Sequence, residues 1–366
     1  MNAIASERQR KLQQLTFAEN QLLTRDLPRD TVLKSLFIRL SGSVVTTFAS
    51  GTPVADAQST MDNIISRIDV IVNGNRTVKN VRPHLLHMQQ LLATQIQGER
   101  KASAAAAAAT GNNPTADGGF TYGTTTQIST VAETVYLPFE NIMCAEGQES
   151  TWLNLKGVSS AEIRFTCAAF AQLLGFGNTA PVVFSSSTFV IDITTNEAQN
   201  VPPEVYFSDW RQTTKELTFS AQTSESVVDL NRGNLLQGVM FFTKSGAAGS
   251  STTATGKLAS NLVLNAIKLI LNGNAIIKST SFLELQAENR NRWGVSAAYA
   301  SNVSRMDGVA YLDLLVKGRL SSALDVRPSK ADQIQLLLDT RSSSDVSYTN
   351  PVSVTLMTNE IVTPRE

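Results

Sequence analysis

The chain has 366 residues, of which 42% are hydrophobic and 17% are charged, and this length predicts two globular domains that each bury a core. Lysine plus arginine and aspartate plus glutamate both number 31, so the chain lacks the global positive charge that binds nucleic acid by releasing counterions. This balance argues against a genome-condensing nucleocapsid protein, and we expect no sequence-specific nucleic-acid partner.

Two cysteines, Cys144 and Cys167, are too few for a disulfide framework in a chain of this length. Two reduced thiols in a product made in the cytoplasm are the simplest interpretation, and a single bridge between them stays open. The first ten residues lack an apolar segment with a cleavage site, and no apolar run reaches about 18 residues. We therefore expect neither a secretion signal nor a membrane span.

The N-terminal segment, residues 1–29, is predicted to be a helical arm. Thr16 and Glu19 have the spacing of a capping box. Basic residues outnumber acidic ones at the start of Ser6 to Leu23, and the apolar residues that follow supply contacts. A short interfacial helix that meets lipid headgroups or a neighbouring subunit is one interpretation, and a solvated, partly disordered arm is the other. The predicted contact residues are Arg8, Arg10, Lys11, Leu12, Leu15 and Phe17.

A strand and a tight turn follow in residues 64–75. Apolar residues recur with a period of two in this segment, as in a half-buried strand. Asn73-Gly74 then supplies the positive φ angles of a two-residue hairpin turn. The same pattern returns without gaps in residues 263–274, which end in Asn272-Gly273. Because an Asn-Gly hairpin alone is common, it is the repetition in the same context that indicates a duplicated domain.

Further blocks recur in the same order in both halves of the chain. The spacing between them drifts, as differences in loop length between two copies of one domain would require. The matched pairs are Leu36–Ile38 with Met240–Phe242, Tyr136–Phe139 with Tyr311–Leu314, Leu153 and Leu155 with Leu324 and Val326, Ile163 and Phe165 with Ile334 and Leu336, and Phe189–Glu197 with Val352–Glu360.

Each copy is also predicted to hold one internal helix. Pro83 suits the first position of a helix, and apolar residues from Leu85 to Ile96 keep helical spacing. The shorter counterpart in the second half is Ser281 to Trp293. After the first helix, residues 104–119 are rich in alanine and then in glycine and asparagine, which is typical of a long exposed loop.

We therefore predict an all-β fold of two tandem eight-stranded jelly-roll β-sandwiches, with a short N-terminal helix and one helix within each sandwich. The predicted domains are residues 30–200 and 201–366, because Pro202-Pro203 interrupts regular structure between them.

This organisation resembles the double jelly-roll major capsid proteins of the tectivirus and adenovirus lineage, including those of icosahedral phages with an internal membrane. The resemblance covers about residues 30–366 and rests on the ordered duplication, with no single diagnostic motif. It implies two jelly rolls that stand side by side and homotrimers that look hexagonal and tile an icosahedral shell. It also implies contacts with penton or minor capsid proteins, an N-terminal helix near the internal membrane, and a place in the virion capsid.

Motifs of catalysis or cofactor binding are weak in this sequence. His84 and His87 are the only histidines, and no further ligand stands at a supporting interval, so we expect no metal and no cofactor. The same count argues against a metal-binding double-cupin protein. Gly249 to Lys257 has the wrong spacing for a phosphate-binding loop, and Gly-x-Ser-x-Gly is absent.

The leading hypothesis is a structural capsid protein without enzymatic activity. Two alternatives are a carbohydrate-binding or adhesion protein built on two β-sandwiches, and an amidase-like hydrolase that acts on glycans. The first would usually show exposed aromatic platforms, and the second would need paired carboxylates in a cleft. Trp152, Trp210 and Trp293 are interpreted as anchors in the core or between subunits.

Overall fold

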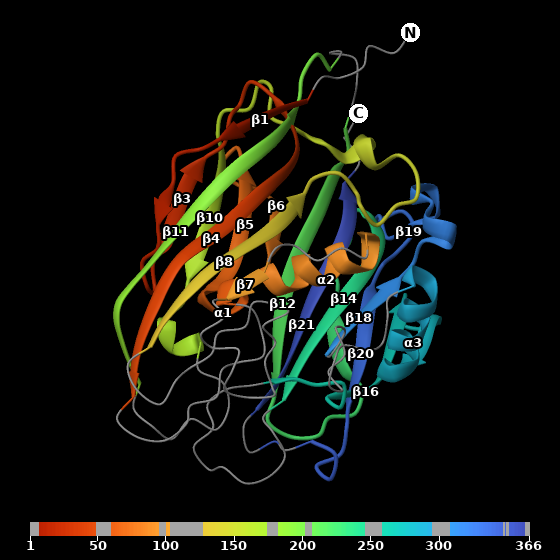
Figure 1. Ribbon diagram of the computed structural model, residues 1–366. Coiled ribbons are helices and arrows are strands. Elements are labelled where there is room, and N and C mark those ends of the chain that lie inside the picture. Colours follow the sequence, from red (N-terminus) through yellow and green to blue (C-terminus); the bar gives the residue numbers. More distant parts are fainter. Residues whose placement is uncertain are drawn as a thin grey trace.

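The computed structural model describes residues 7–48, 60–94, 100–102, 127–173, 182–201, 207–245, 258–294, 308–346, 348 and 351–362. Two β-sandwiches built on one plan and placed side by side make up these residues (Figure 1). The jelly-roll class predicted from the sequence is confirmed. The predicted loop at 104–119, Ile96 and Pro202-Pro203 lie outside the described residues, and the domain boundary stays a prediction.

The first sandwich consists of two facing sheets. Their inward side chains form one core, because apolar residues alternate along each strand and point to the same side. The larger sheet contains β1 (Glu7–Lys11), β2 (Leu15–Thr16), β11 (Val182–Ala198), β4 (Val32–Phe48), β8 (Gln127–Pro138), β7 (Arg100–Ala102) and β9 (Leu153–Asn154). The smaller contains β3 (Leu22–Asp26), β10 (Ala161–Cys167), β5 (Ile65–Val72) and β6 (Arg76–Val81).

The second sandwich repeats this plan with its own core. Its larger sheet contains β12 (Asp209–Phe219), β21 (Val352–Val362), β14 (Leu235–Ser245) and β18 (Val309–Asp313), with the short β15 (Leu258–Ala259) and β19 (Leu324–Asp325). Its smaller sheet contains β13 (Ser226–Asp229), β20 (Ile334–Thr340), β16 (Leu264–Leu271) and β17 (Ala275–Ser281).

One helix follows the hairpin of each sandwich, as predicted. These are α2 (Pro83–Thr94) and α3 (Phe282–Trp293). A capping box starts α3, in which Ser281 Oγ accepts from Glu284 N at 3.2 Å and Ser281 N donates to Glu284 Oε2 at 2.9 Å. The remaining helical turns are α1 (Thr60–Ile64) and the 3-10 turns Gln148–Thr151, Phe170–Leu173, Val316–Gly318 and Leu320–Ser322.

The two Asn-Gly turns occupy equivalent corners. Asn73 and Gly74 have φ angles of 53° and 72°, and Asn272 and Gly273 have 53° and 74°. Each asparagine side chain accepts a backbone hydrogen bond from the loop before the next paired strand: Ser159 N at 2.9 Å in the first copy and Asp332 N at 2.8 Å in the second. The duplication inferred from these turns is therefore confirmed.

Two of the sequence matches were wrong in register. Hydrogen bonding pairs Phe37 with Tyr136 and Met240 with Tyr311, so Phe37 and not Leu36 is the counterpart of Met240. In the same way Ile163 pairs with Val70 and corresponds to Leu336, two residues beyond the predicted Ile334. Sequence similarity could not fix the register, because the register is set by pairing with distant strands, for which the sequence holds no local signal.

The predicted N-terminal helix is wrong. Residues 7–26 form β1, β2 and β3, which pair with β11 and β10 of the first sandwich. Leu15 and Phe17 are 9% and 8% exposed and belong to its core. The apolar residues of this segment do match the helical period in part, but burial in the sandwich and pairing with a sheet edge determine its structure.

Candidate functional site

The junction between the two sandwiches joins them through one pair of strands. Strand β6 pairs in parallel with β12, with Lys79 opposite Gln212 and Asn80 opposite Thr213. This pairing makes one continuous sheet in the order β15-β14-β21-β12-β6-β5-β10-β3, and Figure 1 shows β6 beside β12. Each strand thereby covers an edge that would otherwise expose unpaired backbone groups.

Ion pairs flank this junction. Arg76 Nη1 lies 3.0 Å from Asp209 Oδ2, and Arg82 pairs with Glu216 at the other end of β6. Burial raises the pKa of Asp209, while Arg76 and Lys79 act to lower it. Because all four partners keep some exposure, each pair contributes on the order of 0–1 kcal/mol and mainly favours the observed register.

A buried polar cluster lies at the centre of the junction. Lys79 Nζ donates to Gln212 Oε1 at 2.8 Å, and Gln212 Nε2 donates to Gln89 Oε1 and Asn359 Oδ1, each at 2.8 Å. All four side chains are 0% exposed. Sliding one sandwich along the other would leave these polar groups buried without partners, at about 1–3 kcal/mol for each group. The cluster therefore fixes how the two sandwiches sit side by side.

Lys79 is a lysine whose side chain is fully buried in this cluster. Its ammonium lies 4.0 Å from the ring centroid of Trp210 and 5.7 Å from that of Phe139. Burial lowers the pKa of Lys79 well below the usual value, and attraction to Asp209 opposes this effect. Trp210 itself is 1% exposed, which agrees with its interpretation as an anchor.

Apolar contacts complete the junction. Met240, Phe242, Tyr311 and Met357 of the second sandwich belong to the core cluster of the first, and the rings of His84 and Phe242 lie 4.1 Å apart. The larger sheet of the second sandwich is therefore buried on both faces. This explains the run of apolar residues at 239–242, because a strand covered on both faces needs no alternation.

The two histidines contact a residue that the sequence did not point to. His84 Nδ1 lies 3.2 Å from Asp62 Oδ2, and His87 Nδ1 lies 3.4 Å from Asp62 Oδ1. Asp62 stands in α1, far upstream of any helical spacing to α2, so no short motif could have identified it. Among the residues that the structure describes, no group of three or more His, Cys, Asp or Glu side chains is placed to hold a metal ion.

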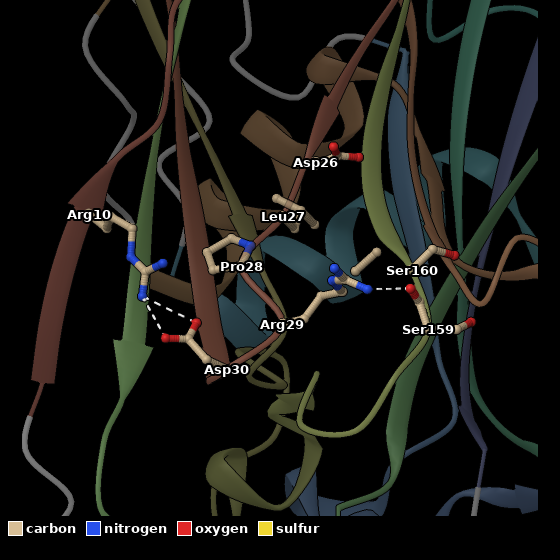
Figure 2. Close-up of a pocket in the computed structure, with 9 residues that line it drawn as sticks. Arg10, Asp26, Leu27, Pro28, Arg29, Asp30, Ser159 and Ser160 are labelled. Atoms are coloured by element: carbon tan, nitrogen blue, oxygen red, sulfur yellow. Dashed lines mark hydrogen bonds and ion pairs between the residues drawn. The ribbon is translucent and has the colours of Figure 1, made fainter.

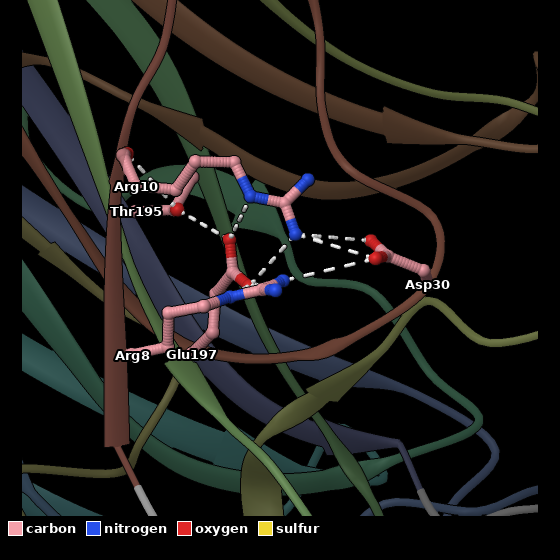
Figure 3. A network of polar contacts seen from close by, with 5 residues as sticks. All are labelled: Arg8, Arg10, Asp30, Thr195 and Glu197. Atoms are coloured by element: carbon pink, nitrogen blue, oxygen red, sulfur yellow. Dashed lines mark hydrogen bonds and ion pairs between the residues drawn. The ribbon is translucent and has the colours of Figure 1, made fainter.

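The predicted N-terminal contact residues are largely engaged within the chain. Glu197 is 0% exposed, and Figure 3 shows it between two arginines. Arg8 Nε donates to Glu197 Oε2 at 2.9 Å, and Arg10 Nε lies 3.2 Å from Glu197 Oε1. Thr195 Oγ1 donates to Glu197 Oε1 at 2.6 Å, and Arg10 also contacts Asp30 at 3.3 Å. These contacts bind β1 to the edge of the larger sheet.

The exposure of the remaining contact residues differs along the segment. Lys11 is 65% exposed and pairs with Asp192 at 3.0 Å, whereas Leu12 packs against the first core. The predicted membrane-facing helix is therefore wrong, and the segment is an edge strand whose exposed side chains are polar or charged.

A shallow hollow of about 700 Å³ lies next to this network. Figure 2 shows Arg10 and Asp30 on one side and Arg29, which donates to the Ser159 carbonyl, on the other. Arg10 and Asp30 thus pair with each other, and Arg29 is bound by a backbone carbonyl. The lining residues are Arg10, Asp26, Leu27, Pro28, Arg29, Asp30, Ser159, Ser160 and Ala161.

Cys144 and Cys167 are both free and buried, so the bridge that the sequence left open does not form. Burial raises the pKa of Cys144 to about 12 and that of Cys167 to about 11. Both thiols are therefore protonated at neutral pH and poor nucleophiles.

No helix in the described parts of the chain is long and apolar enough to cross a membrane.

No protein-family model matches the sequence, and no curated protein matches it. Solved structures do match over nearly the whole chain. For the major capsid protein of Sulfolobus Turreted Icosahedral Virus, 98% of this chain and 97% of that chain align at 14% identity, with a TM-score of 0.60. For the major capsid protein of bacteriophage PM2 the values are 99%, 99%, 11% and 0.56.

The Faustovirus major capsid protein aligns over 100% of this chain and 92% of its own, at 10% identity and a TM-score of 0.54. At these identities the likeness shows the fold. The chain therefore has the double jelly-roll fold of these proteins, with both sandwiches included.

Proposed function

We propose that this chain is a major capsid protein whose three copies form one capsomer of an icosahedral virus shell. The observation that carries this proposal is the junction: two equivalent sandwiches are fixed side by side by paired edges and a buried polar cluster. Three copies of such a unit offer six similar sandwiches to their neighbours. The match of both sandwiches to solved major capsid proteins supports the same role.

The role is mechanical and involves no turnover. Each subunit would contact the next through one repeated interface, because closed rotational symmetry satisfies all three interfaces at once. Six similar outer edges then let a three-fold object sit in a hexagonal lattice. The partners are copies of this chain, neighbouring capsomers and penton or minor proteins.

The N-terminal residues take part as neighbour-facing groups in this proposal. Lys11 and the other exposed side chains of β1 lie at the lateral edge of the first sandwich, where an adjoining subunit would sit. This replaces a helical contact with lipid by a contact between proteins.

The mass of the purified protein tests the proposal. Light scattering should give a particle three times the 39.5 kDa chain, and the same preparation should assemble into closed shells with its minor proteins. A chain that stays monomeric at all concentrations would contradict the proposal. A monomer that binds immobilised glycans would favour the carbohydrate-binding alternative.

A further inference from the structure

We infer that the junction inside the chain is also the template for the contact between copies. This inference rests on the proposed function and names the residues that would join neighbouring subunits. One partner surface, the β17–α3 surface, contains Ile276, Ile277, Lys278, Leu283 and Glu288. The other, the β1–β4 face of a second copy, contains Gln9, Phe37, Arg39, Tyr136 and Asn196.

Strands β6 and β17 are equivalent residue by residue. Lys79 pairs with Val70 and Lys278 pairs with Leu269, each immediately before a register shift. Both strands follow an Asn-Gly turn with almost the same φ angles. What β6 binds is therefore a guide to what β17 can bind.

The two strands differ in what covers them. Val78 is 2% exposed, while its counterpart Ile277 is 40% exposed, and the neighbouring Ile276 is 61% exposed. The difference arises because β6 lies against β12, whereas β17 is the last strand of its sheet within the described residues. An uncovered edge that carries two isoleucines is a surface suited to another chain.

The helices show the same contrast. His84 and Leu283 are each the second residue of their helix, and His84 packs on Phe242 while Leu283 is 46% exposed. Gln89 and Glu288 are each the seventh residue. Lys278 Nζ lies 2.7 Å from Glu288 Oε1, and the two side chains are 32% and 53% exposed. The second sandwich therefore has a partly exposed counterpart of the buried cluster.

The complementary face is the outer side of the larger sheet. In the second sandwich this side carries Met240 and Tyr311, which are 0% exposed because the first sandwich covers them. Their counterparts Phe37 and Tyr136 have tilted rings with centroids 5.2 Å apart, and Phe37 is 36% exposed. The neighbouring Arg39 is also exposed.

The Gln9–Asn196 pair on the β1–β4 face is a further reason to expect contact with Lys278 of a neighbouring chain. Asn196 pairs with Gln9 in the ladder, as Asn359 pairs with Gln212. Asn359 Oδ1 accepts from Gln212 at 2.8 Å, whereas Asn196 Oδ1 is buried without a hydrogen-bond partner among the described residues. Lys278 of an adjoining chain would reach Gln9 as Lys79 reaches Gln212, next to the Asn196 amide.

The two surfaces lie on opposite sides of the molecule, with β1 on one flank and α3 on the other (Figure 1). A contact between them is head to tail, and such contacts close into a ring when the rotation permits. The ring would alternate junctions within chains and junctions between chains.

Engineered cysteines test this contact directly. In Gln9→Cys/Lys278→Cys, the two sulfurs would belong to neighbouring copies at positions equivalent to Lys79 and its ladder partner Gln212. We expect linked dimers and trimers on a non-reducing gel after mild oxidation. Gln9→Cys/Val227→Cys is the matched control, because Val227 is 56% exposed on β13 at the opposite edge of the same sheet as β17. It should stay unlinked, and Cys144 and Cys167 are buried.

A second pair of variants uses the apolar edge. Ile276→Asp should give a folded monomer by light scattering with an unchanged circular dichroism spectrum, and Val227→Asp should keep the mass of the natural chain. This inference is wrong, and the proposed function stands, if the natural chain is a trimer, the Ile276→Asp variant is also a trimer, and the Gln9→Cys/Lys278→Cys variant forms no disulfide between chains. If the natural chain is itself a monomer, the proposed function fails with it.

Discussion

Lys79 is a cation held inside the protein, and its protonation should couple to folding. Because burial lowers its pKa in the folded state, the unfolded chain binds more protons between that lowered pKa and the usual 10.5. Stability should therefore rise as the pH rises through this window. Urea unfolding should show the natural chain gaining stability relative to Lys79→Met between neutral pH and the ordinary lysine pKa.

The same substitution at the exposed Lys330 controls for the change in net charge. A stability difference between the natural chain and Lys79→Met that does not vary with pH would contradict the assignment of a lowered pKa to Lys79.

The glycines of the two hairpins carry a conformational requirement. Gly74 and Gly273 have φ angles of 72° and 74°, and a Cβ atom at either position would meet nothing within 4 Å. Valine should therefore lower the free energy of unfolding by about 1–2 kcal/mol through backbone strain alone. Asparagine, which tolerates positive φ, should cost much less. Equal melting temperatures for the valine and asparagine variants would rule out this explanation.

At the scale of elements, β1 depends on the charge of Glu197. Arg8→Ala with Arg10→Ala would leave a carboxylate that is 0% exposed without its cations, and we expect a loss of about 1–3 kcal/mol, since the arginines are partly exposed. Glu197→Gln in the same background should recover part of that loss. Chemical denaturation checks both variants, and a triple variant no more stable than the double one would show that charge is not the cause.

This structure also changes what a truncation should do. If residues 1–23 were the solvated arm that the sequence allowed, their removal would leave the fold intact. Because Leu15 and Phe17 belong to the core and β1 covers the edge of β11, the truncated chain should instead unfold more easily.

The hairpins, the two internal helices and the order of the strands after residue 30 could be predicted, because each has a local signal in the sequence. The partner of an edge strand has no such signal. Nothing in the residues of β1 shows that β11, almost two hundred residues later, completes their hydrogen bonds. The one-residue error between Leu36 and Phe37 has the same origin, and it matters because it moves every side chain of β4 to the other face.

For the whole molecule, the duplication was visible in sequence but the junction was not. Lys79, Gln89, Gln212 and Asn359 come from four elements and meet only because β6 and β12 pair. Such a cluster of buried polar residues is a long-range property of the fold. The apolar run at 239–242 is the one sign of the junction in the sequence, since it indicates a strand covered on both faces.

End-on images of the purified protein by negative-stain electron microscopy test the account most directly. Averaged particles should show six lobes of similar size with three-fold symmetry, one pair of lobes for each chain. Particles with two lobes, or with two-fold symmetry, would contradict a capsomer built from three side-by-side pairs of sandwiches.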